Sequence, residues 1–421
     1  MAEDESAAST CRLMSMAVRR CNGDPGDHPK RSALRFVLLI GVLSFFADFT
    51  YEGSRSILGP YLAAMGASAT AVGLITGFGE LSGYGLRLVS GRWADSSRQY
   101  WPITIFGYAL QMTAVPLLAF TRSWPEAAVL IILERIGKAI RNPPRDTMLA
   151  NAGGQMGGYG WAFGLNEALD QFGAMVGPLL VSLILARRGD YHLAFATLAV
   201  PAVVNVTLVL LARATYPRPL GSNLGQAPTS SASLPRVYWV YLAGGALAAA
   251  GFADYPLIAY HFSRSHVVPA QWIAIFYAVA MAVSGGGSLA FGRLFDRFGF
   301  KVLIVLAVIS SLFAPLVFLG GFWFALLGAA VWGLGMGVHE SIIPAAVSPI
   351  APAEKRASAF GLFTAAYGVA WFAGSGLIGF LYDRSLAATI VFCVSAVARM
   401  PRMRIVSMTS HECEPAMPGG A

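Results

Sequence analysis

The sequence predicts an all-α, polytopic membrane protein built from two six-helix bundles, and composition and charge spacing are the first evidence. Apolar residues make up 56% of the 421 residues and charged residues only 12%, about half the roughly 25% that soluble domains carry. The charges cluster in short polar segments and leave long uncharged stretches between them. A helix needs about 20 mostly apolar residues to cross a bilayer. The alternating segments of about ten residues that indicate an outer-membrane barrel do not occur in the sequence.

The first half of the chain contains six apolar segments between two polar ones. Residues 1–33 are polar and lack the apolar stretch and cleavage site of a signal peptide, so we expect a cytoplasmic tail. A six-helix bundle over residues 34–213 follows, with apolar segments at 34–56, 58–90 (including a loop near 65–69), 101–121, 125–142, 160–186 and 191–213. Residues 214–236 are rich in Pro, Ser, Gly and Asn, which predicts a flexible cytoplasmic linker.

The second bundle is expected over residues 237–398 and repeats this arrangement. Its apolar segments are 237–261, 267–290, 301–319, 322–347, 356–382 and 386–398. The last segment is short for a membrane crossing. We interpret helix 12 and the C-terminal tail, residues 399–421, as truncated or frameshifted, with a short tilted helix as the alternative.

The distribution of basic residues predicts the orientation in the membrane. With the N-terminus in the cytoplasm, 21 of the 30 Lys and Arg residues fall in cytoplasmic tails, loops and adjoining helix ends, among them Arg141 and Arg145, whereas five fall on the opposite side. Such an excess is typical of cytoplasmic loops. It explains the net charge of +8 without a nucleic-acid partner and predicts a multi-pass protein of a bacterial-type inner membrane.

The two halves resemble each other in sequence. Three short motifs recur in the same order: 46–48 (Phe-Ala-Asp) as 252–254, Gly91-Arg92 with Asp95 as Gly292-Arg293 with Asp296, and 162–165 as 359–362. This order indicates a duplicated six-helix unit. Internal repeats of this kind are typical of secondary transporters, whose substrate site lies at the interface of the repeats.

The segments after the second and eighth helices resemble a motif of the major facilitator superfamily, in which Gly and Asp precede closely spaced basic residues and a second Gly. The matching residues are Gly292, Asp296, Arg297, Gly299 and Lys301 in the second half and Gly91 and Asp95 in the first, where Arg98 stands in place of the second Gly. The resemblance implies a short cytoplasmic turn in which charges latch adjacent helices. The alternative is a solvated turn that is basic only because it is cytoplasmic.

Two further segments resemble motifs of this superfamily. Residues 134–138 resemble its helix-4 motif with an intramembrane arginine, here Arg135. Gly173, Gly177 and Pro178 resemble the helix-5 motif of drug/proton exchangers, which implies export. The alternative for this glycine pair is a stripe of small residues that lets helices pack closely.

Charged residues inside apolar segments are costly and therefore mark functional sites. Asp48, Glu52 and Arg55 share one helix face by their spacing of four and three, and an internal Glu52–Arg55 pair is one interpretation. A Glu134–Lys138 pair would leave Arg135 to face a partner elsewhere. The candidate residues for proton coupling or the substrate cavity are Asp48, Glu52, Arg55, Glu134, Arg135, Lys138, Glu167, Asp170, Asp254 and Glu340.

Carboxylates in a cavity of low dielectric constant can carry protons near neutral pH. We therefore expect the coupling group among Asp48, Glu52, Glu167, Asp170 and Asp254, with Arg135 as counter-charge or substrate anchor. The alternative is that these groups form ion pairs that only shape helix packing.

The sequence as a whole predicts a monomeric, proton-coupled secondary transporter of a small organic solute, working by alternating access, with export favoured. No phosphate-binding Gly-Lys-Ser/Thr loop and no nucleophile–base arrangement is present, so neither an ATP-driven pump nor an enzyme is expected. The four cysteines, Cys11, Cys21, Cys393 and Cys413, are not spaced as metal ligands, and we expect no metal or cofactor. The alternative function is a non-transporting sensor or assembly subunit on the same fold.

Overall fold

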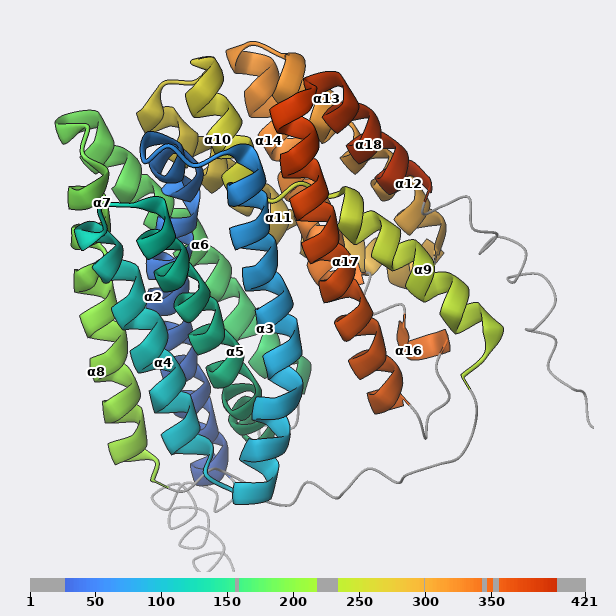
Figure 1. The fold of residues 1–421 in the computed structure, drawn as a ribbon. Coiled ribbons are helices and arrows are strands. Elements are labelled where there is room, and N and C mark those ends of the chain that lie inside the picture. The colour runs from blue at the N-terminus through green and yellow to red at the C-terminus, as the bar shows by residue number, and fades with distance from the viewer. Residues whose placement is uncertain are drawn as a thin grey trace, which may run out of the picture.

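The computed structural model describes residues 27–155, 159–217, 234–298, 300–342, 347–350 and 356–399. Within these ranges the chain folds into helices and contains no strand. Figure 1 shows the helices before residue 218 and those after residue 233 as two groups that lie side by side. We refer to them as the first half and the second half.

The first half contains seven α-helices and a short 3₁₀ turn in the residues described. They are α2 (Asp27–Ala64), α3 (Ala69–Ser97), α4 (Tyr100–Leu117), η1 (Leu118–Phe120), α5 (Trp124–Gln155), α6 (Tyr159–Arg188), α7 (Tyr191–Thr197) and α8 (Ala199–Thr215). The boundary expected after residue 56 is wrong, because α2 continues through Pro60 to Ala64. The end expected at residue 142 is also wrong, because α5 continues to Gln155.

Helix α5 passes through two consecutive prolines because a neighbouring helix satisfies a backbone group that they leave free. Pro143 has no N–H to donate to the carbonyl oxygen of Ala139, four residues earlier. Ser90 of α3 donates its hydroxyl to that oxygen at 2.9 Å instead. This contact lets α5 remain helical at a position where the sequence alone predicts that the two prolines end the helix.

The second half is more interrupted. Its described elements are α9 (Arg236–Gly251), α10 (Tyr255–Ser265), α11 (Ala270–Phe298), α12 (Phe300–Ser311), α13 (Phe313–Leu319), α14 (Phe322–Gly337), the π-helical turn η2 (Val338–Ile342), α16 (Val347–Ile350), α17 (Arg356–Arg384) and α18 (Leu386–Arg399). The continuous helix expected over 237–261 is broken at 252–254. Residues 386–398 are helical as expected, whereas the tail 400–421 lies outside the described residues.

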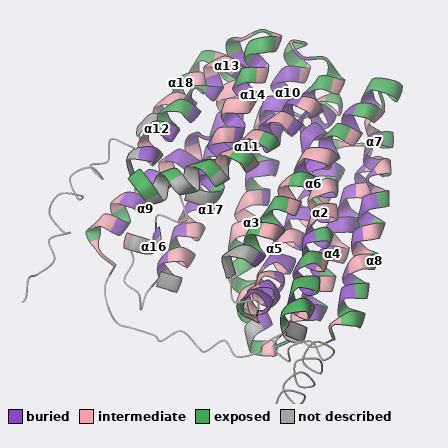
Figure 2. Cartoon of the chain, turned by 180° about the vertical axis from the view of Figure 1, so that it is seen from behind, coloured by how far each residue is buried: buried purple, intermediate pink, exposed green. Residues whose placement is uncertain are grey.

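Eight segments of the described chain are long and apolar enough to cross a membrane. The other four expected crossings fall on α3 and α5, which carry several charges, and on the shorter apolar helices at 304–319 and 386–397. Figure 2 shows exposed residues along the outer surface of both halves. Large apolar side chains are among them, such as Phe120 and Trp323, 77% and 76% exposed. An outer surface with such exposed apolar side chains is suited to contact with lipid tails rather than with water.

The halves meet closely at one end of the molecule, which we call the closed end and define by Ala64, Ala69, Pro256 and Asp383. Glycines let the backbones touch there. A β-carbon on Gly59 of α2 would overlap the carbonyl oxygen of Pro256, and one on Gly73 of α3 would overlap that of Ser375 in α17. Any larger residue at these two positions would force the halves apart.

Asp383 binds the start of α3 across the same interface. Its carboxylate accepts hydrogen bonds from the backbone N–H groups of Ala69 and Thr70, at 3.1 and 2.8 Å, and from the Thr70 hydroxyl at 2.6 Å. Ser68 accepts the next backbone N–H, that of Ala71, at 3.1 Å. A helix N-terminus carries free donors and partial positive charge, so a residue of the second half caps a helix of the first.

We expect Asp383→Ala to loosen the closed end, because it removes a cap worth about 1 kcal/mol, equivalent to about fivefold in an equilibrium constant. Maleimide labelling of a cysteine introduced at Ser375, in a background without the native cysteines, should become about fivefold faster. Asp190→Ala is the matched control, because Asp190 caps α7 at His192 within one half. Equal labelling rates in both variants would show that Asp383 does not hold the halves together.

Candidate substrate cavity and charge cluster

A cavity of about 330 Å³ lies between the two halves. Helices α2, α3 and α5 line it from the first half, and α14, η2 and α17 from the second. Its lining residues are Tyr51, Glu52, Arg55, Glu80, Gly83, Tyr84, Arg87, Arg135, Lys138, Ala139, Met336, His339, Glu340, Thr364 and Trp371. A second cavity, of about 490 Å³, lies by Tyr61 and His192 in the first half and contains none of the predicted site residues.

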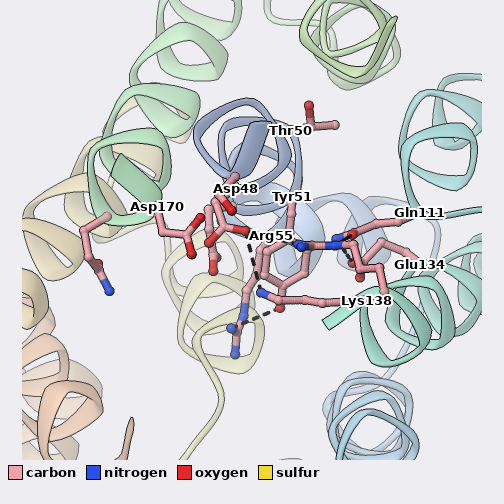
Figure 3. A network of polar contacts seen from close by, with 12 residues as sticks. Asp48, Thr50, Tyr51, Arg55, Gln111, Glu134, Lys138 and Asp170 are labelled. Atoms are coloured by element: carbon pink, nitrogen blue, oxygen red, sulfur yellow. Dashed lines mark hydrogen bonds and ion pairs between the residues drawn. The ribbon is translucent and has the colours of Figure 1, made fainter. Parts of the chain in front are cut away.

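The ring of Tyr51 lies at the centre of the charged side chains. Lys138 Nζ is 3.9 Å from the ring centroid, and the guanidinium carbons of Arg135 and Arg55 are 4.9 and 5.9 Å from it. Figure 3 shows Arg55 and Lys138 beside this ring, and Asp170 of α6 on the side of Asp48. Attraction between cations and an aromatic face strengthens where water is excluded, so Tyr51 helps to hold three cations in one place.

Arg55 joins the two halves through an ion pair. Its guanidinium donates to Asp254 of the second half at 2.5 Å, and it lies 3.4 Å from Glu80 of α3. It also donates to the Tyr51 hydroxyl at 3.2 Å. The Arg55 and Asp254 side chains are only 5% and 1% exposed. The internal Glu52–Arg55 pair is therefore replaced by pairs with Asp254 and Glu80, because the other half supplies a better placed carboxylate.

Glu52 makes a different kind of contact with the second half. Tyr277 of α11 donates its hydroxyl to the Glu52 carboxylate. Among the described residues no Lys or Arg nitrogen lies within the 4.0 Å of an ion pair with Glu52. Glu52 also lines the cavity. It is thus a carboxylate that faces the cavity and is held by a neutral donor.

Arg135 has a partner on another helix, although the Glu134–Lys138 pair from which the sequence predicts this does not form. Its guanidinium lies 2.9 Å from Glu80 of α3. The expected Glu134–Lys138 pair is wrong: Glu134 accepts a hydrogen bond from the Gln111 amide at 2.8 Å, whereas Lys138 lies 3.8 Å from Asp48 of α2. The two residues bond to different neighbouring helices, and Glu134 also lies 3.7 Å from Arg135 Nε of its own helix.

Arg141 and Arg145 contribute to the same cluster, which corrects their assignment to cytoplasmic loops. Arg141 is 1% exposed, donates to Gln111 at 2.6 Å and lies 3.7 Å from Asp48. Arg145 donates to Ser44 at 3.0 Å and lies 4.0 Å from Asp170. The spacing of Arg135, Lys138, Arg141 and Arg145 by three, three and four could have revealed them, because it places all four on one face of α5.

The remaining predicted residues lie in several environments. Glu167 is exposed and accepts a hydrogen bond from Gln171 at 2.9 Å, outside the cavity lining. Glu340 lies in η2 and lines the cavity. A β-carbon on Gly173 or Gly177 would overlap a backbone oxygen of α2, so these glycines, with Pro178 in the same helix, let α6 pack tightly on α2.

The proposed latch motif lies mostly within helices rather than in turns. Gly91 and Asp95 belong to the last turns of α3, and the chain turns at Arg98, whose φ is 53°. Gly292, Asp296 and Arg297 belong to α11, and Lys301 to α12. Gly299 and the side chains of Asp95, Asp296 and Lys301 lie outside the described residues. The charge latch therefore stays a prediction.

Comparison with known proteins identifies the family. The model of the Major Facilitator Superfamily matches residues 38–375. The chain belongs to this superfamily. It is 39% identical to an uncharacterised protein of Mycobacterium tuberculosis (strain ATCC 25618 / H37Rv) over 87% of this chain and 91% of that protein.

Two further comparisons concern a relative in sequence and a similar fold. An uncharacterised transporter of the superfamily from Methanocaldococcus jannaschii is 24% identical over 90% of this chain and 96% of that protein. The crystal structure of a mutant of the nucleoside transporter NupG matches with a TM-score of 0.74 and 13% identity, over 88% of this chain and 100% of that one. This superfamily member is a polytopic all-α membrane protein, and transmembrane transport is its function.

We expect Arg55→Met to lower the free energy of unfolding by about 3–5 kcal/mol, because it leaves buried Asp254 without its cation. Thermal unfolding in detergent, followed by tryptophan fluorescence, measures the loss. The Arg55→Met/Asp254→Asn double variant should recover part of it, and Arg187→Gln, at the exposed end of α6, should change little. A double variant less stable than Arg55→Met would contradict the pairing.

Proposed function

We propose that this transporter couples the movement of a small organic solute to protons by alternating access of its two halves. In this proposal the protein is a monomer in a bacterial-type inner membrane, with its N-terminus in the cytoplasm and export as its direction. The resemblance of residues 173–178 to the motif of drug/proton exchangers favours export. When Arg141 and Arg145 are counted with the charge cluster, nineteen basic residues still fall on the cytoplasmic side in this orientation and five on the other.

The contact between Glu52 and Tyr277 carries the proposal of proton coupling. A proton on Asp254 or Glu80 would leave the buried guanidinium of Arg55 or Arg135 with one partner fewer, and an unpaired buried charge is strongly destabilising. Glu52 has a neutral donor and no cation within ion-pair distance in the described chain. It can gain a proton without leaving a cation unpaired, so we assign the coupling role to it.

Protonation of Glu52 would act directly on the interface between the halves. Hydrogen bonds to an ionised acceptor are roughly twice as strong as those between neutral groups. A proton on Glu52 therefore weakens the bond from Tyr277, which crosses from the second half to the first. The Arg55–Asp254 pair keeps its charges in this step. Of the two contacts that Glu52 and Arg55 of α2 make with the second half, the one from Glu52 then depends on the proton and the one from Arg55 does not.

The position of the cavity fits one state of such a cycle. The lining residue Arg87 lies 18 residues beyond Ala69 of the closed end, a distance of about 27 Å along α3. The cavity therefore extends away from the closed end. With the N-terminus in the cytoplasm it faces the cytoplasmic side, where a solute bound for export would enter.

We expect Glu52→Gln to abolish solute-dependent proton flux and to retain solute exchange without a gradient, because the amide cannot carry the proton. Proteoliposomes with a trapped pH-sensitive dye, exposed to a panel of small amines, acids and zwitterions, measure the flux. Glu126→Gln is the matched control, because this exposed residue of α5 bonds the nearby backbone N–H of Arg122 and lies outside the cavity lining.

Proton flux that persists in Glu52→Gln would overturn the assignment of the coupling group. A wild-type protein that moves no solute of the panel, with or without a gradient, would instead favour a sensor or assembly role.

A further inference from the structure

Three charged residues of the cavity lining have no ion-pair partner among the described residues. One of them, Glu52, is held by the hydrogen bond from Tyr277, and the other two are oppositely charged. Arg87 comes from α3 of the first half, and Glu340 from η2 of the second, and both are exposed. Four other lining charges, those of Arg55, Glu80, Arg135 and Lys138, lie within 4.0 Å of an opposite charge. Arg87 and Glu340 are therefore available to a solute, one on each half.

An aromatic surface connects the two charges. The Arg87 guanidinium lies over the ring of Tyr84, at 5.6 Å from its centroid. The Tyr84 ring contacts that of Tyr367 in α17 edge to face at 5.8 Å. Tyr367 in turn shares a hydrogen bond with His339, the residue before Glu340. The path from Arg87 to Glu340 thus crosses between the halves over two tyrosine rings.

An unused hydrogen-bond donor lies beside this surface. Trp371 lines the cavity and is 3% exposed, and its indole N–H has no hydrogen-bond partner among the described residues. Its ring lies 5.8 Å from that of Tyr367. Buried donors are nearly always satisfied, so this N–H indicates that an acceptor on a bound molecule, or water in its place, belongs there.

The π-helical turn η2 supports a binding role for Glu340. Turns of this kind are rare and occur frequently at functional sites. Here the turn covers Val338–Ile342 and directly follows α14. It places the buried His339 and the exposed Glu340 next to each other along the cavity lining.

We propose that the cavity binds a zwitterionic solute with an aromatic or apolar body, its anionic group at Arg87 and its cationic group at Glu340. This inference rests on the proposed transport function and names its substrate class. A solute with a single charge would leave either Arg87 or Glu340 uncompensated. A zwitterion compensates both, and because they come from different halves its binding draws the halves together at the cavity.

Binding to four forms of one molecule tests the proposal. Phenylalanine supplies the zwitterion, its amide the cation, its N-acetyl form the anion, and the N-acetyl amide the neutral form. A parallel set on 4-(aminomethyl)benzoate changes the distance between the charges. Quenching of tryptophan fluorescence in the purified full-length protein, with no gradient, gives the affinities. In at least one set the zwitterion should bind about tenfold more tightly than the other three forms.

Single substitutions should change the preference in opposite directions. With Arg87→Gln the amide should bind as tightly as the zwitterion, and with Glu340→Gln the N-acetyl form should do so. Arg92→Gln is the matched control, because Arg92 is an exposed cation of the same helix outside the cavity lining. It should leave the tenfold preference unchanged.

The proposal is overturned if no zwitterion in either set binds more tightly than its singly charged forms. It is equally overturned if the two substitutions weaken all four forms alike. Because binding is measured at equilibrium, a loss of proton coupling would leave these affinities unchanged, and the failure of the proposed function is distinguishable from the failure of this inference.

Discussion

The buried charge of Arg55 is the constraint on which the arrangement of the halves depends. A guanidinium in a membrane protein interior is tolerated only when carboxylates compensate it, and Arg55 takes one from α3 and one from the second half. The glycine contact at the closed end makes the second partner reachable. Gly59 lies one helical turn beyond Arg55 and packs against Pro256, two residues after Asp254. The backbone contact of Gly59 with Pro256 and the Arg55–Asp254 ion pair therefore require each other.

The duplicated motif shows how the two halves have come to differ. Asp48 lies within the unbroken helix α2, whereas Asp254 lies in the break before α10. Asp254 occupies the N-cap position, yet its side chain makes no capping hydrogen bond there. Pro256 in the first turn has no N–H to satisfy, which leaves the Asp254 carboxylate available to Arg55. The Phe-Ala-Asp motif thus lies within a continuous helix in the first half, whereas in the second half it contributes to the contact between the halves.

The sequence predicts much of the fold, because apolar length and basic loops follow directly from the membrane. It also places Arg135 inside a helix, although the local Glu134–Lys138 pair from which its interhelical partner was expected does not form. It does not predict that Asp254 rather than Glu52 binds Arg55, since partners on different helices depend on packing that no local spacing encodes. Arg141 and Arg145 were missed for a related reason: Ser90, on another helix, lets α5 continue past Pro143. The contact between Glu52 and Tyr277 cannot be found from charge spacing, because tyrosine carries no charge.

The glycines of the closed end have a consequence for the speed of motion. Side chains that interlock at an interface lose rotamer freedom when they meet, at up to about 2 kcal/mol for each long one. Gly59 and Gly73 place backbone against backbone, where there are no rotamers to order. When the halves separate or meet at these two glycines, no side-chain rotamers are freed or ordered. Side-chain conformational entropy therefore adds little to the barrier in either direction.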